Sequence, residues 1–211
     1  IVRETEPLGT GGALGNCRDV ISDRFVCLNG DIISSLDMQV GIDLHEKNGG
    51  IGTLALWKVE DPTRFGIVGL DEHQRITQFK EKPKKEEVFS NLINAGSYLF
   101  EDSIFDYIPE GRSSLERDVF PVLAQEGKLN GFSFEGYFID AGTPKSWSMG
   151  VKASIANKRW NSGKKVDTNW YADDSINVDA KSSVEHTMLS KGAMINSASL
   201  TNCSLLENVT I

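Results

Sequence analysis

Short apolar runs of strand length alternate with helix-like segments over the first 160 residues, and this alternation constrains the fold more than any other feature. Strands are predicted at 25–28, 51–59, 66–70, 75–80 and 92–100, with one or two more across 130–139. Helices are predicted at 37–48, 102–107 and 114–125, and from Thr143-Pro144 to about Trp160. Such alternation is typical of layered α/β domains, so we expect an α/β fold with a mainly parallel sheet.

The pattern changes after Lys165. Small residues then separate single aliphatic ones, and several aliphatics recur at a six-residue step: Val178 and Val184, Leu189 and Ile195, Leu200 and Leu206, Leu205 and Ile211. A six-residue period predicts rungs of a parallel β-helix. The register slips between the pairs, and a short β-rich tail fits the pattern nearly as well. We therefore predict two domains, residues 1–165 and residues 166–211.

Charge and composition narrow the function. The chain has 211 residues, 22 Lys and Arg against 30 Asp and Glu, and a net charge of −8. An acidic chain is a poor general binder of nucleic acid, so phosphates must be held by a local site. The apolar runs are too short to span a bilayer, and the start shows no secretory signal. Three widely spaced cysteines, Cys17, Cys27 and Cys203, argue against a disulfide framework or a zinc site and predict the cytoplasm.

Two lone carboxylates directly follow predicted strands. Asp31 comes after strand 25–28 through Asn29-Gly30, and Asp140 follows residues 137–139. Ligands of open α/β sheets bind beyond the carboxyl ends of the strands. Two carboxylates there can hold one Mg²⁺, which takes one or two carboxylates together with phosphate oxygens and water. Asn-Gly-Asp is also a common turn, and Asp140 can equally be an acid at a helix N-terminus, but their joint occurrence favours a Mg²⁺ site.

A charged pair leaves the predicted strand 75–80. In Glu81-Lys82-Pro83 the acid suits sugar hydroxyls and the compact cation suits a phosphate. A solvated loop is the simpler interpretation of this segment alone. Lys80, Lys84 and Lys85 compete for the same role.

A glycine-rich segment, residues 8–13, leads into a predicted helix. Its backbone can approach a base or a phosphate closely, but no Gly-Lys-Ser/Thr follows, so it is not a Walker loop. Gly96 in Asn94-Ala95-Gly96 weakens a strand unless a ligand or another chain segment approaches its backbone closely. It therefore indicates that this strand forms one wall of a ligand-binding site. Gly66 fits a turn or a phosphate-facing position, and Glu116 fits an ordinary first-turn helix acid equally well.

Taken in order, seven motifs resemble the sugar-phosphate nucleotidyltransferase (nucleotide-sugar pyrophosphorylase) family. They are Glu6-Pro7-Leu8-Gly9-Thr10-Gly11-Gly12-Ala13, Leu28-Asn29-Gly30-Asp31, residues 59–68, Phe79-Lys80-Glu81-Lys82-Pro83, Asn94-Ala95-Gly96-Ser97-Tyr98, residues 114–121 and residues 136–144. Each is weak alone, but seven in order across residues 5–160 are specific. They are most similar to the mannose-1-phosphate guanylyltransferase branch, and similar also to heptose-1-phosphate guanylyltransferases and archaeal glucose-1-phosphate nucleotidyltransferases.

The resemblance implies a Rossmann-like nucleotidyltransferase fold over residues 1–165, followed by the start of a left-handed parallel β-helix over 166–211. It implies transfer of a nucleoside monophosphate from GTP to mannose 1-phosphate, with release of pyrophosphate. The implied nucleotide-binding residues are Leu8, Gly9, Thr10, Gly11, Gly12, Asn29 and Gly30. The implied sugar-phosphate residues are Gly66, Glu81, Lys82 and Asn94. Asp31 and Asp140 are expected to bind Mg²⁺ and, with Lys82, to be catalytic.

The family also has a first strand and a Gly-rich loop with Arg and Pro-Lys, which grips the triphosphate. The resemblance places that loop several dozen residues before Ile1, so activity is not expected of these 211 residues alone. The expected partners are a nucleoside triphosphate and a hexose 1-phosphate, without nucleic acid or membrane. An open β-helix end favours packing against further rungs or another subunit, so a homo-oligomer stays open.

Three other functions stay open. Glucose 1-phosphate with UTP or dTTP fits the same motifs. A catalytically silent regulatory subunit is favoured by the absent loop and opposed by Asp31, Lys82 and Asp140. A hexapeptide-repeat acyltransferase needs a long solenoid with a catalytic histidine, and only His186 falls in the tail.

Overall fold

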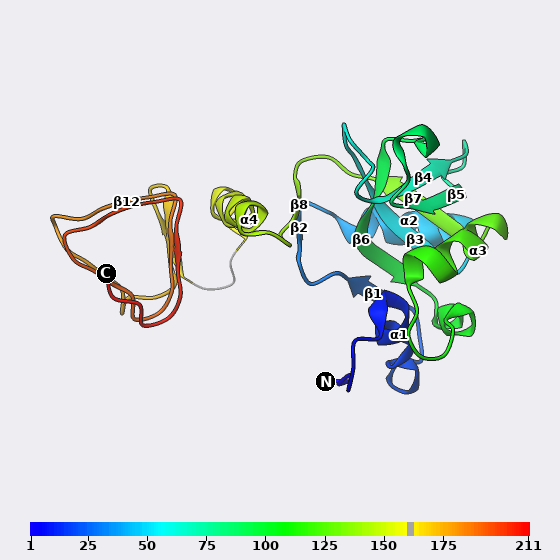
Figure 1. Ribbon diagram of the computed structural model, residues 1–211, viewed down its shortest axis with the longest axis horizontal. Helices are drawn as coiled ribbons and strands as arrows, with labels where there is room; N and C mark the ends of the chain where they lie inside the picture. The colour runs from blue at the N-terminus through cyan, green and yellow to red at the C-terminus, as the bar shows by residue number, and fades with distance from the viewer. Residues whose placement is uncertain (160–162) are drawn as a thin grey trace. The chain divides into compact units, whose positions relative to one another are not determined.

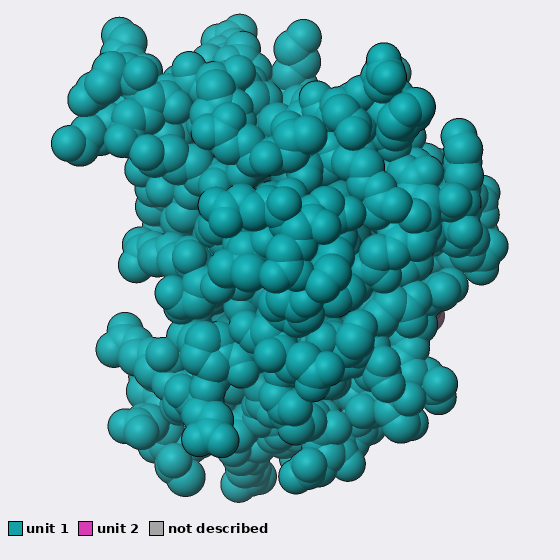
Figure 2. All heavy atoms as spheres, turned by 90° about the vertical axis from the view of Figure 1, so that its right-hand side faces the viewer, with its two compact units in different colours: residues 1–30, 35–136 teal, residues 31–34, 137–211 magenta. Residues whose placement is uncertain are grey.

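The computed structural model describes residues 1–159 and 163–211 and divides the chain into two compact units (Figure 1). The first unit holds residues 1–30 and 35–136, and the second holds residues 31–34 and 137–211. Figure 2 shows one face of the first unit. The predicted domains, 1–165 and 166–211, stay a prediction, since this division by contacts falls elsewhere.

A six-stranded sheet forms the centre of the first unit (Figure 1). Its strands are β1 (Phe25–Leu28), β3 (Gly52–Lys58), β4 (Gly66–Leu70), β5 (Ile76–Glu81), β6 (Leu92–Phe100) and β7 (Leu129–Ser133). The strand order is β5-β4-β6-β3-β7, and β1 pairs with β6. Each predicted strand of this region is therefore confirmed as a strand, including the hairpin of β4 and β5.

The strand directions differ from the prediction. Only β3 and β7 pair in parallel, while the pairs of β6 with β1, β3 and β4, and of β4 with β5, are antiparallel. The expected mainly parallel sheet is therefore wrong for the described residues. Residues 71–75 connect β4 to β5, and so short a link can only reverse the chain, because a parallel neighbour needs a crossover of roughly a dozen residues or more.

Helix α2 (Met38–Asn48) covers one face of the sheet. It begins where predicted, because the Asp37 carboxylate accepts a 3.0 Å bond from the Gln39 N–H, and it ends at Gly49, whose φ is 64°. Buried His45 on this helix contacts Thr53 of β3, with 2.8 Å between Nδ1 and Oγ1. These contacts fix the helix against the sheet.

The opposite face carries the main aromatic core. The π-helical turn η4 (Leu115–Val119) leads into α3 (Phe120–Gln125), and of the two serines before it Ser114, not Ser113, is the cap. Phe120 packs against Phe79, Tyr98 and Phe100. The predicted single helix over 114–125 is a π-helical turn followed by an α-helix. Pro121 has no N–H to donate to the carbonyl four residues earlier, so the regular α-helical bonding is interrupted there.

Strand β1 was predicted to be buried, and only half of it is. Phe25 and Cys27 pack against the aromatic core, whereas Val26 is 44% exposed and Leu28 is 60% exposed. Alternate side chains of a strand point to opposite faces, so a short apolar run alone cannot reveal that one face is uncovered. The shorter helical elements of the first unit are α1 (Gly9–Gly15), η1 (Arg18–Val20), η2 (Lys85–Glu87) and η3 (Asp102–Tyr107).

The second unit opens with β2 (Ile32–Ser34), paired antiparallel with β8 (Phe138–Asp140). Helix α4 (Pro144–Ala156) follows, and Thr143 caps it as predicted, accepting a 3.2 Å bond from the Ser146 N–H. The helix ends at Ala156, short of the predicted end, and Trp160 itself lies outside the described residues.

The tail of the second unit is built from short strands that pair mostly in parallel. They are β9 (Lys164–Val166), β10 (Asn169–Tyr171), β11 (Asn177–Val178), β12 (Ser183–Glu185), β13 (Met188–Leu189), β14 (Met194–Ile195), β15 (Ser199–Thr201) and β16 (Ser204–Leu205). β10, β13 and β16 form one parallel set, β11 and β14 a second, and β12 and β15 a third. The chain thus returns to the same side after 16 to 18 residues.

Aliphatic side chains fill the centre of this tail. Leu189, Ala193 and Ile195 are fully buried, with Val178, Val184, Leu200 and Leu205 packed around them. Apart from Ala193, these inward positions are the ones that the six-residue step predicted. The step failed for Leu206, which is 66% exposed, and for Ile211, which is 44% exposed, because the spacing between inward positions varies between five and six residues.

Candidate functional site

A hollow of about 610 Å³ in the first unit brings together three distant segments. Gly9 and Thr10 line it from α1, and Glu81 and Lys82 line it from the end of β5. The third segment consists of residues 112–114, which precede η4, and residues 116–118 within η4. The structure thus joins part of the predicted nucleotide loop to the predicted sugar-phosphate pair.

Glu81 and Lys82 face this hollow with different burial. The Glu81 side chain is 16% exposed and the Lys82 side chain 61% exposed, and Lys82 Nζ lies 3.8 Å from Glu81 Oε1. Burial raises the pKa of Glu81, and the negative charge of Glu116 raises it further. The backbone of Lys82 has a φ of 45°, and its N–H donates a 3.0 Å bond to the Phe65 carbonyl. A non-glycine residue in this region costs about 1–3 kcal/mol, and such residues cluster at functional sites.

The competing lysines are placed elsewhere. Lys80 Nζ forms an ion pair with Glu87 at 2.8 Å. Lys84 and Lys85 line a different hollow. Of the four candidates, Lys82 is therefore the one that lines the hollow with Glu81. Gly66 stands opposite Glu81 in the β4–β5 ladder, and a Cβ on it would come within 2.9 Å of Glu81 Oε2.

The glycines of α1 have a packing role that the sequence did not reveal. Gly9 has a φ of 75°, and a Cβ on it would lie 2.5 Å from the Ser113 carbonyl oxygen. The N–H groups of Gly11 and Gly12 donate to the same carbonyl at 3.0 and 3.3 Å. Close approach of the chain to itself therefore accounts for these glycines. Their role in binding a base, like that of Leu8, stays a prediction.

Thr10 is held by side chains across the hollow. Its hydroxyl donates a 2.6 Å bond to Glu116 Oε2 and accepts a 3.0 Å bond from the Leu115 N–H. Ser114 Oγ donates a 2.7 Å bond to the same Glu116 oxygen. Glu116 is thus more than a first-turn helix acid.

Asn94 and Asn29 are connected through Gly96. The Asn94 amide donates a 2.9 Å bond to the Tyr98 hydroxyl, and its oxygen accepts a 3.2 Å bond from the Gly96 N–H. Gly96 has a φ of 66°, its carbonyl accepts a 2.8 Å bond from the Asn29 N–H, and a Cβ on it would strike the Asn29 side chain at 2.7 Å. The mid-strand glycine therefore serves close packing on Asn29. Gly30 has open space beside it.

The two predicted metal ligands lie together in the second unit. Asp31 and Asp140 are adjacent because β2 pairs with β8, and the Ala141 N–H donates a 2.8 Å bond to the Asp31 carbonyl. A Cβ added to Gly142 would lie 3.0 Å from Asp140 Oδ1 and 3.9 Å from Asp31 Oδ2. Glycine thus leaves a cradle open between two carboxylates, which fits a Mg²⁺ ion that completes its shell with phosphate oxygens and water. Among the described residues no group of three or more His, Cys, Asp or Glu side chains suits a metal.

Two arginines of the hollow were missed in the sequence. Arg112 and Arg117 line it and form no ion pair within the described part of the chain. They stand beside Glu81 only because η4 packs on β5 and α1, a contact across more than thirty residues. In the sequence, the two arginines could have been suspected only from their position on either side of Ser113-Ser114-Leu115-Glu116.

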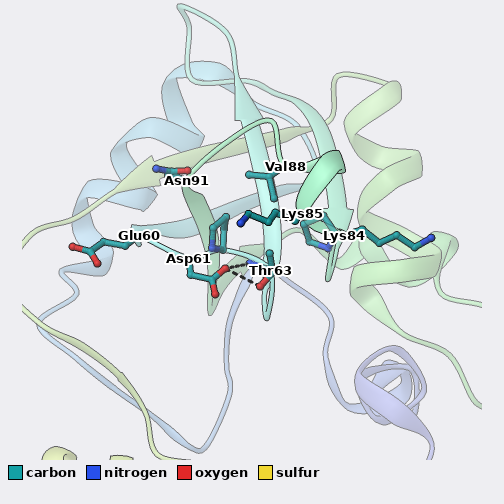
Figure 3. A pocket seen from close by; sticks show the side chains of 9 residues that line it. Glu60, Asp61, Thr63, Lys84, Lys85, Val88 and Asn91 are labelled. Atoms are coloured by element: carbon teal, nitrogen blue, oxygen red, sulfur yellow. Dashed lines mark hydrogen bonds between the residues drawn. The ribbon is translucent and has the colours of Figure 1, made fainter.

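A second hollow, of about 850 Å³, lies where residues 60–63 face residues 83–91 (Figure 3). Its polar groups are largely engaged or turned aside. Asp61 Oδ1 accepts bonds from both the N–H and the hydroxyl of Thr63 at 3.1 and 2.7 Å. In Figure 3 the side chains of Glu60 and Lys84 extend away from each other at opposite ends. Of the residues considered for the site, only the competing Lys84 and Lys85 line it, so the smaller hollow is the better candidate site.

Residues 1–155 match the family model described as nucleotidyl transferase. The chain belongs to the nucleotidyl transferase family. It is 40% identical over 153 residues to a mannose-1-phosphate guanylyltransferase of Mycobacterium tuberculosis, which covers 71% of this chain and 42% of the relative. It is 36% identical over 168 residues to the mannose-1-phosphate guanylyltransferase catalytic subunit beta of Drosophila melanogaster, covering 78% of this chain and 45% of the relative. The chain therefore spans less than half the length of these relatives.

Solved structures of the nucleotidyl transferase family share the fold. A putative glucose-1-phosphate thymidylyltransferase from Bacillus anthracis, in complex with a sucrose, matches with a TM-score of 0.64 and 29% identity over 77% of this chain and 67% of that chain. HddC from Yersinia pseudotuberculosis complexed with GMP-PN matches with a TM-score of 0.56 and 29% identity over 70% of this chain and 63% of that chain. The predicted family and the mixed α/β nucleotidyltransferase-like fold are confirmed. Within the described residues, no helix is both long and apolar enough to cross a membrane.

Proposed function

We propose that this nucleotidyl transferase carries the body of an enzyme that transfers GMP from GTP to mannose 1-phosphate and releases pyrophosphate. The observation that carries the proposal is the hollow that Thr10, Glu81 and Lys82 line together. A group proposed for the nucleotide thus shares this hollow with an acid suited to sugar hydroxyls and a cation suited to a phosphate. The choice of GTP and mannose 1-phosphate rests on the names of the relatives.

The reaction is a phosphoryl-type transfer. An oxygen of the sugar phosphate attacks the α-phosphorus in line, the bond from that phosphorus to the bridging oxygen breaks, and its electron pair leaves with pyrophosphate. A phosphate is already anionic at neutral pH, so no general base is needed. The difficulty is to bring two anions together, and fixed cations relieve their repulsion.

The residues of the first unit bind and orient the substrates under this proposal. Glu81 accepts bonds from sugar hydroxyls and Lys82 holds the sugar phosphate, while Arg112 and Arg117 add positive charge at the same hollow. Asn94, held by Tyr98, and Gly66 complete the sugar side. Leu8, Gly9, Thr10, Gly11 and Gly12, with Asn29 and Gly30, stay the proposed nucleotide side.

The second unit would hold the metal. Asp31 and Asp140 would supply the two carboxylates, and Mg²⁺ held by them would supply positive charge for phosphate oxygens. The proposed catalytic groups are therefore two acids that hold the metal, Asp31 and Asp140, and one lysine, Lys82. The proposed reaction requires no catalytic histidine.

We propose that the parallel-strand tail is the start of a left-handed β-helix and that its open side supports self-association. The domain division at residue 165 also remains proposed. The three cysteines are unpaired, which suits a reducing compartment such as the cytoplasm.

One alternative has its own support. The Bacillus anthracis structure is named a putative glucose-1-phosphate thymidylyltransferase, so glucose 1-phosphate with dTTP or UTP is the second candidate. The deciding experiment incubates the full-length protein with Mg²⁺, each of GTP, UTP, dTTP and ATP, and each of several hexose 1-phosphates, and measures pyrophosphate release. Release that needs both a sugar phosphate and the metal supports the proposal and names the pair. No release from any pair by the folded protein overturns it in favour of a catalytically silent regulatory subunit.

A further inference from the structure

A short side-chain hydrogen bond joins two walls of the hollow. Thr10 is the second residue of α1 and Glu116 lies in η4, and their side chains meet although 106 positions separate them in the chain. The 2.6 Å bond from Thr10 Oγ1 to Glu116 Oε2 is charge-assisted, and such bonds are roughly twice as strong as neutral ones.

The bond belongs to a network that also includes Ser114 and the backbone of η4. Thr10 Oγ1 also accepts from the Leu115 N–H at 3.0 Å, so the hydroxyl both donates and accepts. Glu116 Oε2 receives a second bond from Ser114 Oγ at 2.7 Å, and Ser114 Oγ accepts in turn from the Arg117 N–H at 3.3 Å. The start of η4 is therefore organised around the Thr10 hydroxyl.

The neighbouring backbone contacts leave little freedom for α1 to move alone. The Ser113 N–H donates a 3.0 Å bond to the Leu8 carbonyl, and the Ser113 carbonyl receives the N–H groups of Gly11 and Gly12. These bonds fix the distance between the two segments. The Thr10–Glu116 bond joins a side chain of α1 to a side chain of η4. It therefore favours one orientation of α1 relative to η4.

We propose that Glu116 is a positioning residue that acts through Thr10, holding the first turn of α1 in the orientation that binds the nucleotide. This inference rests on the proposed function and deepens it. Glu81 and Lys82 lie in the same hollow, so the link also sets the nucleotide side against the sugar side. Glu116 acts here as a hydrogen-bond acceptor, so an uncharged oxygen in the same place should keep most of the link, with a weaker bond.

The test uses five variants of the full-length protein. Thr10→Val removes the hydroxyl at equal shape, and Thr10→Ser keeps it. Glu116→Ala removes the acceptor, whereas Glu116→Gln keeps an amide oxygen that can accept both bonds. The fifth variant combines Thr10→Val with Glu116→Ala. Thr63→Val is the matched control, because it removes a 2.7 Å hydroxyl–carboxylate bond to Asp61 outside the hollow.

Steady-state kinetics with the nucleotide and the sugar phosphate varied separately give the main readout. We expect Thr10→Val and Glu116→Ala each to raise the KM for the nucleotide about tenfold, the loss of one partly exposed charged hydrogen bond. The double variant should also lose about tenfold, not about a hundredfold, because residues that act as one unit are not additive. Thr10→Ser, Glu116→Gln and the Thr63→Val control should stay within about twofold of the parent. A double variant that shows the product of the single effects, or a Glu116→Gln as impaired as Glu116→Ala, overturns the proposal.

A second readout separates this inference from the proposed function. Amide hydrogen exchange over residues 8–15 and 113–117 needs no activity. Thr10→Val and Glu116→Ala should speed exchange in both segments, and Thr10→Ser and Glu116→Gln should not. If the parent protein releases no pyrophosphate from any pair, the proposed function fails, and this exchange pattern alone decides the link. Unchanged exchange in all four single variants overturns it.

Discussion

The side-chain amide of Asn94 is bound at 2.9 Å to the hydroxyl of Tyr98, a residue that is 1% exposed. Burial raises the pKa of that hydroxyl far above its ordinary value, so the hydroxyl is neutral at neutral pH. The amide oxygen is held as well, by the Gly96 N–H at 3.2 Å. Asn94 therefore has a single orientation before any ligand arrives.

Tyr98→Phe should release one end of this amide. We expect the KM for the sugar phosphate to rise about fivefold and stability to fall by about 1 kcal/mol, the usual worth of one neutral hydrogen bond. Kinetics and urea unfolding measure the two effects. Tyr107→Phe is the control, because its hydroxyl bonds to exposed Glu126 outside the hollow. Equal KM values for the two variants would contradict the role given to Tyr98.

Removal of either predicted metal ligand should nearly abolish turnover. Asp31→Ala and Asp140→Ala each delete a carboxylate from the cradle beside Gly142, and loss of a group that stabilises transition-state charge costs about 10²–10³-fold in kcat. The fold should persist, because neither carboxylate is buried in the core. Pyrophosphate release and circular dichroism check both points. Retention of most activity in either variant would remove the metal assignment.

Gly142→Ala tests the same cradle without removing a ligand. Its Cβ would stand 3.0 Å from Asp140 Oδ1, an oxygen already held by the Gly142 N–H at 3.0 Å. The carboxylate must then shift, and we expect the Mg²⁺ concentration for half-maximal rate to rise about tenfold, as for loss of an outer-shell contact. A magnesium titration at saturating substrates measures it. Gly30→Ala, with open space around its Cβ, offers the comparison on the other side of Asp31.

The raised pKa of Glu81 should appear in the pH profile. Below that pKa the carboxyl is protonated and loses its capacity to accept from sugar hydroxyls, so kcat/KM for the sugar phosphate should fall about tenfold per pH unit. Glu116→Gln removes the charge that raises this pKa and should move the acidic limb to lower pH. Measurement of kcat/KM from pH 4 to 8 gives the acidic limb of the profile for the parent and for Glu116→Gln. If this limb lies at the same pH in both, the charge of Glu116 does not act on Glu81.

The same raised pKa has a consequence for stability with a defined sign. The folded protein holds the Glu81 proton more tightly than the unfolded chain, so stability falls as pH rises from the unfolded pKa to the folded pKa and stays lower above it. Glu81→Gln removes this cost. The variant should therefore be inactive on its sugar and melt at a higher temperature at neutral pH.

Local chemistry allowed most elements to be predicted. Asp37 and Gly49 mark the ends of α2, and Ser114 and Thr143 mark two further helix starts, because caps act within one turn. Strand direction could not be predicted in the same way. The antiparallel place of β6 between β3 and β4 depends on contacts between residues far apart in sequence.

The site divides along the same line. Glu81 and Lys82 are neighbours in the chain, so their meeting at one hollow could be predicted from a motif. Asp31 and Asp140 were expected to follow strands, but Asp140 lies within β8, and the pairing of β2 with β8 brings it close to Asp31. The roles of all four residues stay predictions. Arg112 and Arg117 could not be found, because only the packing of η4 against β5 and α1 brings them to the hollow. The glycines of α1 indicated correctly that another group packs closely against this segment. The sequence did not reveal that this group is the backbone of Ser113.

The parallel-strand tail has a consequence for how such a chain can change in length. The chain meets the same side again after 16 to 18 residues, at Trp170 and Met188 and then at Ser204. Insertion or deletion of one whole circuit would leave the buried Leu189 and Ile195 facing inward, whereas a change of two or three residues would turn one of them outward. Lengths of this tail among relatives should therefore differ in steps of a full circuit.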